Sequence, residues 1–132
     1  MSDIADDEVP TPLGELTLQA VAMPKDTNAS GDIFGGWLVS QMDLAGLVSA
    51  ERIAHGRVAT VAIDEMSFMV PVKVGAVVSC YTTLVRTGRS SIHVQVEVWA
   101  VNQGKTELHK VTEGVFVFVA IDDNGRTRAI SK

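Results

Sequence analysis

The hydrophobic positions of the chain follow two periods, and residues 35–54 form the one long stretch with a helical pattern. This stretch is apolar nearly all the way round, which is typical of a buried helix rather than one on a surface. Residues 24–36, just before and at its start, are rich in Pro, Asp, Asn, Ser and Gly and are predicted to form a loop. We expect Asp32 to cap the helix N-terminus, and His55 with Gly56 to end the helix.

Alternation of apolar and polar positions predicts five strands, which span residues 13–23, 57–69, 77–86, 91–101 and 106–121. The phase shifts at Asp64 and Glu65, which predicts a bulge, and the last strand is apolar on both faces, which predicts a central position. The four strands after the helix are joined by short turns and are therefore antiparallel, and the helix must pack on their sheet to be buried. The sequence predicts an α+β domain over residues 13–132, with an antiparallel five-stranded sheet wrapped around one long central helix.

Composition narrows the class of protein. With 132 residues, 46% hydrophobic positions and a mean hydropathy of +0.21, the chain fits one globular domain. We expect no membrane association, because no apolar run of about 18 residues is free of charge or Gly, and no secretion signal, because no basic region precedes an apolar block. Cys80 is the only cysteine, which excludes an internal disulfide and fits a reducing cytoplasm, where we expect the protein to act.

The net charge of −5 is concentrated at the start of the chain. Residues 1–12 contain four acidic residues and no basic one, and their prolines discourage regular pairing. This segment is therefore predicted to be a flexible acidic arm. The remaining residues hold 12 acids and 11 bases, which argues against nucleic-acid binding because that function requires a basic excess.

Asp43 is the one ionisable side chain in the apolar core of the helical stretch. A lone carboxylate in a buried helix is costly unless it is paired or functional, so Asp43 is either tied into a subunit interface or part of an active site. The positions that share its helix face are mostly small, so a partner backbone or a ligand can approach it: Gly36, Val39, Ser40, Gly46, Leu47 and Ala50.

The stretch from Ala22 to Trp37, AMPKDTNASGDIFGGW, followed by Met42 and Asp43, resembles the acyl-CoA thioesterases of the hotdog-fold superfamily. The nearest resemblance is to the small bacterial YciA-type acyl-CoA hydrolases. Four further segments support it, and together the matches cover residues 13–130: residues 54–58, 88–92, 96–99 and 116–120.

The resemblance implies a hotdog fold and hydrolysis of an acyl-coenzyme A thioester to a free acid and coenzyme A. It implies no metal and no redox cofactor. It carries Asp43 over as the catalytic carboxylate and Asn28 as its polar partner. It also implies a homodimer of hotdogs as the working unit, commonly assembled as a hexamer, a trimer of dimers.

The chemistry of thioester hydrolysis can be matched to these residues. The reaction needs an activated water or a nucleophile, and donors for the oxyanion on the carbonyl. Asp43 can serve as general base or as attacking carboxylate, and the N–H groups of Gly35 and Gly36 lie at the positive end of the helix. Close packing alone would also explain the two glycines. Gly36 and Asp43 lie roughly 10 Å apart along one helix, so if both are catalytic they come from different subunits of a dimer.

Coenzyme A brings phosphates, which require cations and donors. Arg89 is the first choice for coenzyme A binding, because Gly88, Ser90 and Ser91 surround its guanidinium with turn amides and hydroxyls. Arg57 is a further candidate. The alternative for Arg89 is an ordinary solvated arginine in a hairpin turn.

Two other functions compete with the thioesterase interpretation. A non-catalytic acyl-CoA sensor on the same fold would not need a carboxylate at Asp43. A dehydratase acting on a carrier-protein thioester would need a histidine near the helix, and residues 24–36 contain none. The three histidines also lack the spacing of a metal site.

Overall fold

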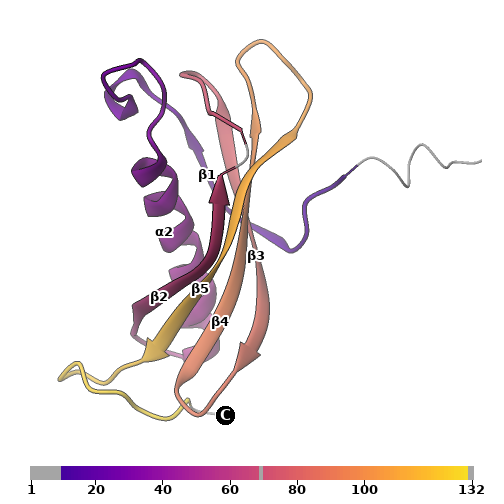
Figure 1. The fold of residues 1–132 in the computed structure, drawn as a ribbon. Coiled ribbons are helices and arrows are strands. Elements are labelled where there is room, and N and C mark those ends of the chain that lie inside the picture. The colour runs from indigo at the N-terminus through magenta and orange to yellow at the C-terminus, as the bar shows by residue number, and fades with distance from the viewer. Residues whose placement is uncertain (1–9, 69, 131–132) are drawn as a thin grey trace, which may run out of the picture.

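The computed structural model describes residues 10–68 and 70–130 of the chain. It has one long helix and five strands, with one turn of 3-10 helix between the first strand and the long helix (Figure 1). In chain order these are β1 (Glu15–Val21), η1 (Pro24–Asp26), α2 (Gly35–Ala54), β2 (Val58–Phe68), β3 (Val77–Thr87), β4 (Ser91–Val101) and β5 (His109–Ala120).

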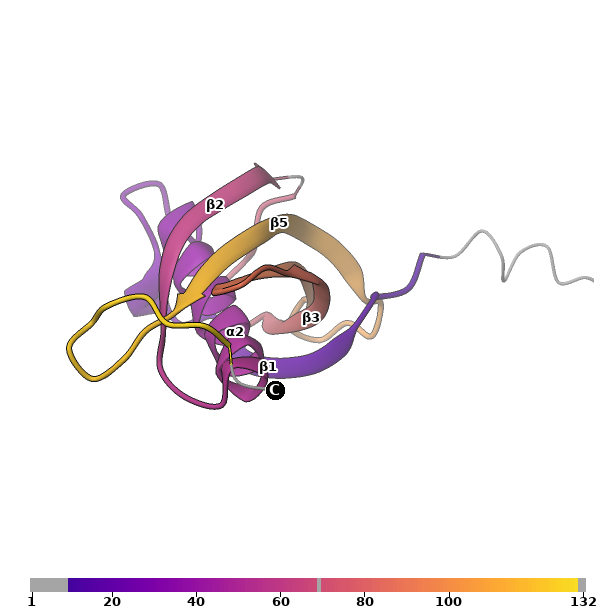
Figure 2. The ribbon, with the colours of Figure 1, turned by 90° about the horizontal axis from the view of Figure 1, so that it is seen from below.

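The five strands form one antiparallel sheet in the order β1-β3-β4-β5-β2. Figure 2 shows the sheet curving around α2, which lies against its inner face. The core between the two is built from apolar side chains that are fully or almost fully buried, among them Leu38, Met42, Ala45, Ala50, Val94, Val96, Val98, Phe116 and Phe118. The predicted α+β hotdog architecture is confirmed.

The bounds of α2 agree with the predicted helix, which His55 and Gly56 end as expected, but the cap at its N-terminus differs from the prediction. Phe34 occupies the N-cap position, and no side chain caps the helix, so the prediction for Asp32 is wrong. The backbone N–H of Asp32 instead bonds to the side chain of Asn28. At the other end, His55 rather than Gly56 adopts the left-handed conformation, with a φ of 54°.

One face of α2 remains uncovered in the single chain, contrary to the prediction of a helix buried all round. Leu44 on this face is 51% exposed, and Gly36 and Ser40 are exposed as well. The physical reason is that one sheet can cover only one face of a helix. The small residues divide accordingly, since Gly46 lies under the chain's own Phe118 ring, which a Cβ at Gly46 would approach to 2.9 Å.

The strands match the sequence pattern except at some ends. The last strand begins at His109 rather than at residue 106, and β1 is shorter than predicted. The predicted bulge is confirmed, because the β2–β5 register shifts between Asp64 and Ser67 and Glu65 has a φ of 54°. β5 lies inside the sheet between β4 and β2, as its two apolar faces indicate.

The outer face of the sheet holds a buried charge. The carboxylate of Glu97 accepts hydrogen bonds from Trp99 Nε1 at 2.9 Å and from the backbone N–H of Leu13 at 3.1 Å, and it lies 3.5 Å from Lys110 Nζ. Burial lowers the pKa of Lys110, but its bond to Glu113 and the charges of Glu97 and Glu113 outweigh this and raise it overall.

Most of the predicted acidic arm, residues 1–9, lies outside the described residues.

Candidate active site

Asp43 lies in the middle of α2, half-buried, and is held by a residue of the neighbouring edge strand. Thr60 Oγ1 donates a hydrogen bond to Asp43 Oδ1 at 2.7 Å. Thr60 pairs with Phe118 on β5, whose ring faces α2, so its side chain points to the same inner face of the sheet. A charge-assisted bond of this kind fixes the carboxylate and leaves its second oxygen for a water or a substrate.

Thr60 was not identified from the sequence. Its place on β2 gives it a contact with α2, but the register shift between Thr60 and Ala62 interrupts the alternation that would have marked the inner face. A polar residue within the apolar first half of β2, residues 58–63, opposite an isolated helix carboxylate, is the signal that could have found it.

The side chain of Asn28 shapes the loop that leads into α2. Its Oδ1 accepts hydrogen bonds from the backbone N–H groups of Ser30 at 2.9 Å and Asp32 at 3.2 Å. These two bonds orient the amide so that its NH₂ group points away from the loop backbone that it holds. Among the described residues of the single chain, no hydrogen bond joins Asn28 to Asp43.

Gly35 and Gly36 form the first turn of α2, where backbone N–H groups have no acceptor within the helix. The N–H of Phe34 donates to Asp26 O and that of Trp37 to Phe34 O, at 3.4 and 3.1 Å. The N–H groups of the two glycines have no hydrogen-bond acceptor among the described residues. Two donors at the positive end of a helix are suited to a developing oxyanion.

The separation between these donors and Asp43 remains as the sequence predicted. Because α2 is continuous from Gly35 to Ala54, Gly36 and Asp43 lie roughly 10 Å apart along it. Oxyanion donors act at about 3 Å, so the idea that the two groups reach one thioester from different subunits stays a prediction.

The predicted coenzyme A turn joins β3 to β4 at the far end of the sheet from the two glycines. The N–H of Gly88 donates to Ser91 O at 2.9 Å, and a Cβ at Gly88 would lie 2.6 Å from Ser91 Oγ, so a larger residue there would have to displace the Ser91 hydroxyl. Ser90 O accepts the N–H of Ala120 at 2.8 Å, which ties the turn to the end of β5.

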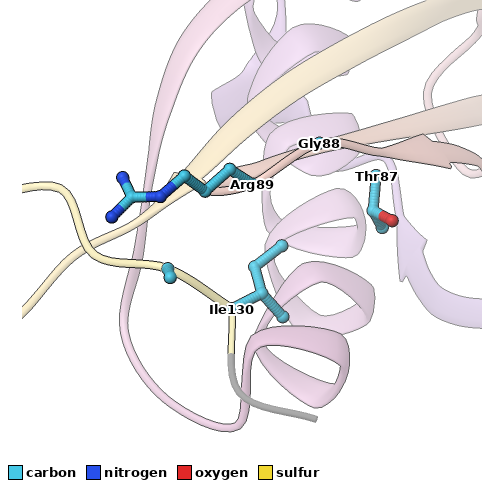
Figure 3. A pocket seen from close by; sticks show the side chains of 5 residues that line it. Thr87, Gly88, Arg89 and Ile130 are labelled. Carbon is cyan, nitrogen blue, oxygen red and sulfur yellow. The ribbon is translucent and has the colours of Figure 1, made fainter.

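A cavity of about 410 Å³ lies beside this turn. It is lined by Thr87 at the end of β3, by Gly88 and Arg89 of the turn, and by Ala129 and Ile130 of the C-terminal segment (Figure 3). Arg89 is exposed, so its guanidinium is available to a ligand. Such a cavity, with a cation at its rim and apolar residues on one wall, can hold a flat ring bearing phosphates.

Arg57 lies at the same end of the sheet but is bound elsewhere. Its O accepts the N–H of Ile121 at 3.0 Å, and its Nη1 donates to Asp122 O at 3.4 Å and Asp123 O at 3.5 Å. Arg57 is not among the residues that line the cavity beside Arg89. The structure therefore groups Gly88, Arg89 and the C-terminal segment, and assigns Arg57 to the neighbouring turn.

Cys80 is not a candidate nucleophile. It is fully buried in β3, and burial raises the pKa of its thiol from 9.0 to about 12. A thiol attacks a thioester as the thiolate, so this residue is inert near neutral pH.

Comparison with known proteins supports the family indicated by this geometry. The thioesterase superfamily profile matches residues 30–107. The acyl-CoA thioester hydrolase YciA of Salmonella typhimurium is 50% identical over 91% of this chain and 92% of its own. Two solved structures are each 51% identical with a TM-score of 0.88. The hexameric thioesterase y2039 from Yersinia pestis covers 92% of this chain and 99% of its own, and HI0827, a hexameric broad-specificity acyl-coenzyme A thioesterase, covers 93% and 85%.

The chain therefore belongs to the thioesterase superfamily of hotdog-fold enzymes, among the YciA-type acyl-CoA thioester hydrolases. In addition, none of the described helices is long and apolar enough to cross a membrane.

Proposed function

We propose that this protein hydrolyses acyl-coenzyme A thioesters to the free acid and coenzyme A, with Asp43 as the catalytic carboxylate. The observation that carries the proposal is the hydrogen bond of 2.7 Å from Thr60 to Asp43 on the uncovered face of α2. A sensor would have no use for a carboxylate fixed at such a place, because a carboxylate repels the phosphates of the ligand and contributes nothing to binding an uncharged acyl chain.

In this mechanism each group has a defined role. Asp43 removes a proton from the attacking water or attacks the thioester carbonyl itself, and Thr60 holds it in the required orientation. The N–H groups of Gly35 and Gly36 stabilise the oxyanion, and the NH₂ group of Asn28 supplies a further polar contact in the site. The thiolate of coenzyme A leaves, and no metal or redox cofactor takes part.

The site is completed by a second copy of the chain. Two apolar regions that a partner would cover surround Asp43 in the single chain: Leu44 on α2, and the edge strand β2 with Val61 56% and Ile63 42% exposed. An exposed apolar edge strand is a site for strand pairing with another copy. Two-fold pairing across these regions would bring Asp43 of one subunit close to the Gly35 and Gly36 amides of the other.

Three such dimers would form the complete assembly. The relatives from Yersinia pestis and HI0827 are hexameric, and a trimer of hotdog dimers is the simplest hexamer built on a two-fold site. The coenzyme A nucleotide would bind at the β3–β4 turn, with Arg89 at its phosphates.

The experiment is a thiol-release assay on purified protein with acyl-CoA substrates of increasing chain length. Steady release of coenzyme A by the wild-type protein, abolished in Asp43→Asn and retained in Glu51→Gln, supports the proposal. Both variants replace a carboxylate of α2 by an amide, so Glu51→Gln controls for the loss of charge. Tight binding of acyl-CoA without release would favour the sensor.

A further inference from the structure

The C-terminal segment, residues 126–130, folds back across the end of the sheet. The N–H of Arg128 donates to Ala120 O at 2.9 Å, and that of Ile130 donates to Arg89 O at 2.9 Å. Thr127 forms an isolated antiparallel bridge with Ile121. The segment therefore connects the end of β5 to the β3–β4 turn, although it has no regular strand of its own.

The side chain of Arg128 fixes this segment to the end of α2. Its Nη2 donates to Ala54 O at 2.9 Å and its Nε to Ile121 O at 3.1 Å. A Cβ at Gly56 would lie 2.8 Å from Nη2, so the glycine makes room for the guanidinium. The last carbonyl groups of a helix lack partners and carry partial negative charge, which makes this a favourable place for a cation.

These anchors determine one wall of the cavity beside Arg89. Ala129 and Ile130 line it opposite Thr87 and Gly88, and the two walls come from segments about 40 residues apart in the chain (Figure 3). Ile130 is half-buried and packs against the core. The wall exists only as long as residues 129–130 are held in place, and Arg128 is the adjacent residue whose side chain bonds to two other elements.

We propose that Arg128 is a positioning residue for the nucleotide half of coenzyme A. It holds Ile130 as the apolar wall on which the adenine base packs, while Arg89 contacts the phosphates. The inference rests on the proposed function, because the nucleotide is that of the acyl-CoA substrate. It adds a role for a residue that neither touches the thioester nor lies near Asp43.

The test compares two substrates in Arg128→Ala. We expect KM for acyl-CoA to rise about tenfold with kcat nearly unchanged, while KM for the matching acyl-pantetheine, which lacks the nucleotide, changes less than about twofold. The inhibition constant of adenosine 3′,5′-bisphosphate should rise about as much as KM for acyl-CoA. The control is Arg126→Ala, an exposed arginine in the same segment whose hydrogen bonds to Asp122 run through its backbone.

Equal changes for both substrates, or no change for adenosine 3′,5′-bisphosphate, would overturn the inference, since a merely structural role lowers the melting temperature without separating the two substrates. Failure of the wild-type protein to hydrolyse any acyl-CoA would instead overturn the proposed function. The two failures are therefore distinguishable.

A second variant decides the matter if Arg128→Ala does not fold. Ile130→Ala shortens the wall and leaves every hydrogen bond of Arg128 in place, because the N–H of Ile130 is retained. We expect the same selective loss, about threefold to tenfold in KM for acyl-CoA alone. A folded Ile130→Ala protein with unchanged KM for acyl-CoA and unchanged inhibition by adenosine 3′,5′-bisphosphate would show that the nucleotide does not pack on Ile130.

Discussion

The two ends of helix α2 differ in whether their terminal backbone groups have hydrogen-bond partners. At the N-terminal end, the N–H groups of Gly35 and Gly36 have no acceptor among the described residues, and the N-cap side chain makes no bond. At the C-terminal end, Glu51 O accepts the N–H groups of His55 and Gly56, and Ala54 O accepts Arg128 Nη2 at 2.9 Å.

The N-terminal end of α2 is therefore suited to a catalytic role, and its C-terminal end to a structural one. Free donors at the N-terminus are available for a negative charge that develops during a reaction. At the C-terminus, the carbonyl of Ala54 accepts a hydrogen bond from Arg128, which fixes the helix to the C-terminal segment. Substitutions near the N-terminal end of α2 should therefore alter kcat, whereas substitutions near its C-terminal end should alter binding of the nucleotide.

The largest effect is expected at Asp43, in the middle of the helix. Asp43→Ala removes the proposed base or nucleophile and should lower kcat by about 10²-fold or more, the scale of a general acid–base group. Steady-state kinetics with a saturating acyl-CoA measure kcat, and calorimetric titration with coenzyme A should still detect binding. Undiminished turnover in the pure variant would contradict the assignment.

A smaller effect is expected at Thr60. Thr60→Val removes the hydrogen bond to Asp43 at almost constant volume and should lower kcat about tenfold, because a bond to a charged group is worth about 1.5–3 kcal/mol. Thr60→Ser keeps the hydroxyl and should retain most activity. If the two variants have the same kcat, the hydroxyl does not orient the carboxylate.

Near the C-terminal end of α2, substitutions are expected to change KM rather than kcat. Arg89→Ala removes a guanidinium beside the nucleotide cavity and should raise KM for acyl-CoA about fivefold to tenfold, on the scale of one charge-assisted contact. The same variant should bind an acyl-pantetheine as well as the wild-type protein does. Equal losses for both substrates would show that Arg89 does not contact the phosphates.

The last prediction concerns stability rather than activity, at Cys80, away from both ends of α2. Its thiol has a raised pKa of about 12, so between pH 9 and 12 the folded protein binds a proton that the unfolded chain has released. The free energy of unfolding should therefore fall with rising pH in this range, by up to about 1.4 kcal/mol per pH unit more than in Cys80→Ala. Urea denaturation at several pH values measures the slopes, and identical slopes would contradict the burial effect.

Much of the fold could be predicted because local patterns determine it. Residues 35–54 are apolar over five turns and residues 91–101 alternate without interruption, so the structure reproduces both bounds. The bulge at Asp64 and Glu65 was visible as a break in phase. Asp32 was assigned as a cap by residue type, but it lies two positions before the N-cap Phe34, and its carboxylate lies 3.5 Å from Lys73 Nζ.

The parts of the site that the sequence did not reveal depend on contacts between distant residues. Arg128 and Ala54 are 74 positions apart, and Glu97 and Leu13 are 84 apart, so no local pattern connects them. Thr60 contacts Asp43 only because β2 lies at the edge of the sheet beside α2. Such pairings follow from strand order, which the sequence pattern leaves open.

The account depends most on a site shared between two subunits, and mixed oligomers test it directly. Asp43→Ala is one inactive parent. The other is Gly36→Val, whose side chain should block approach to the helix amides while displacing only the Phe34 ring, 3.1 Å from a Cβ at this position. Mass spectrometry and thermal melting establish that each variant folds and that the co-expressed chains mix.

If Asp43 and the glycine amides come from different subunits, each mixed dimer holds one site with both defects and one site with neither. Co-expression should then restore about half of the wild-type activity per mixed dimer, as two-fold symmetry requires. If both groups act within one subunit, every site keeps one defect. A folded and fully mixed population without activity would contradict the shared site.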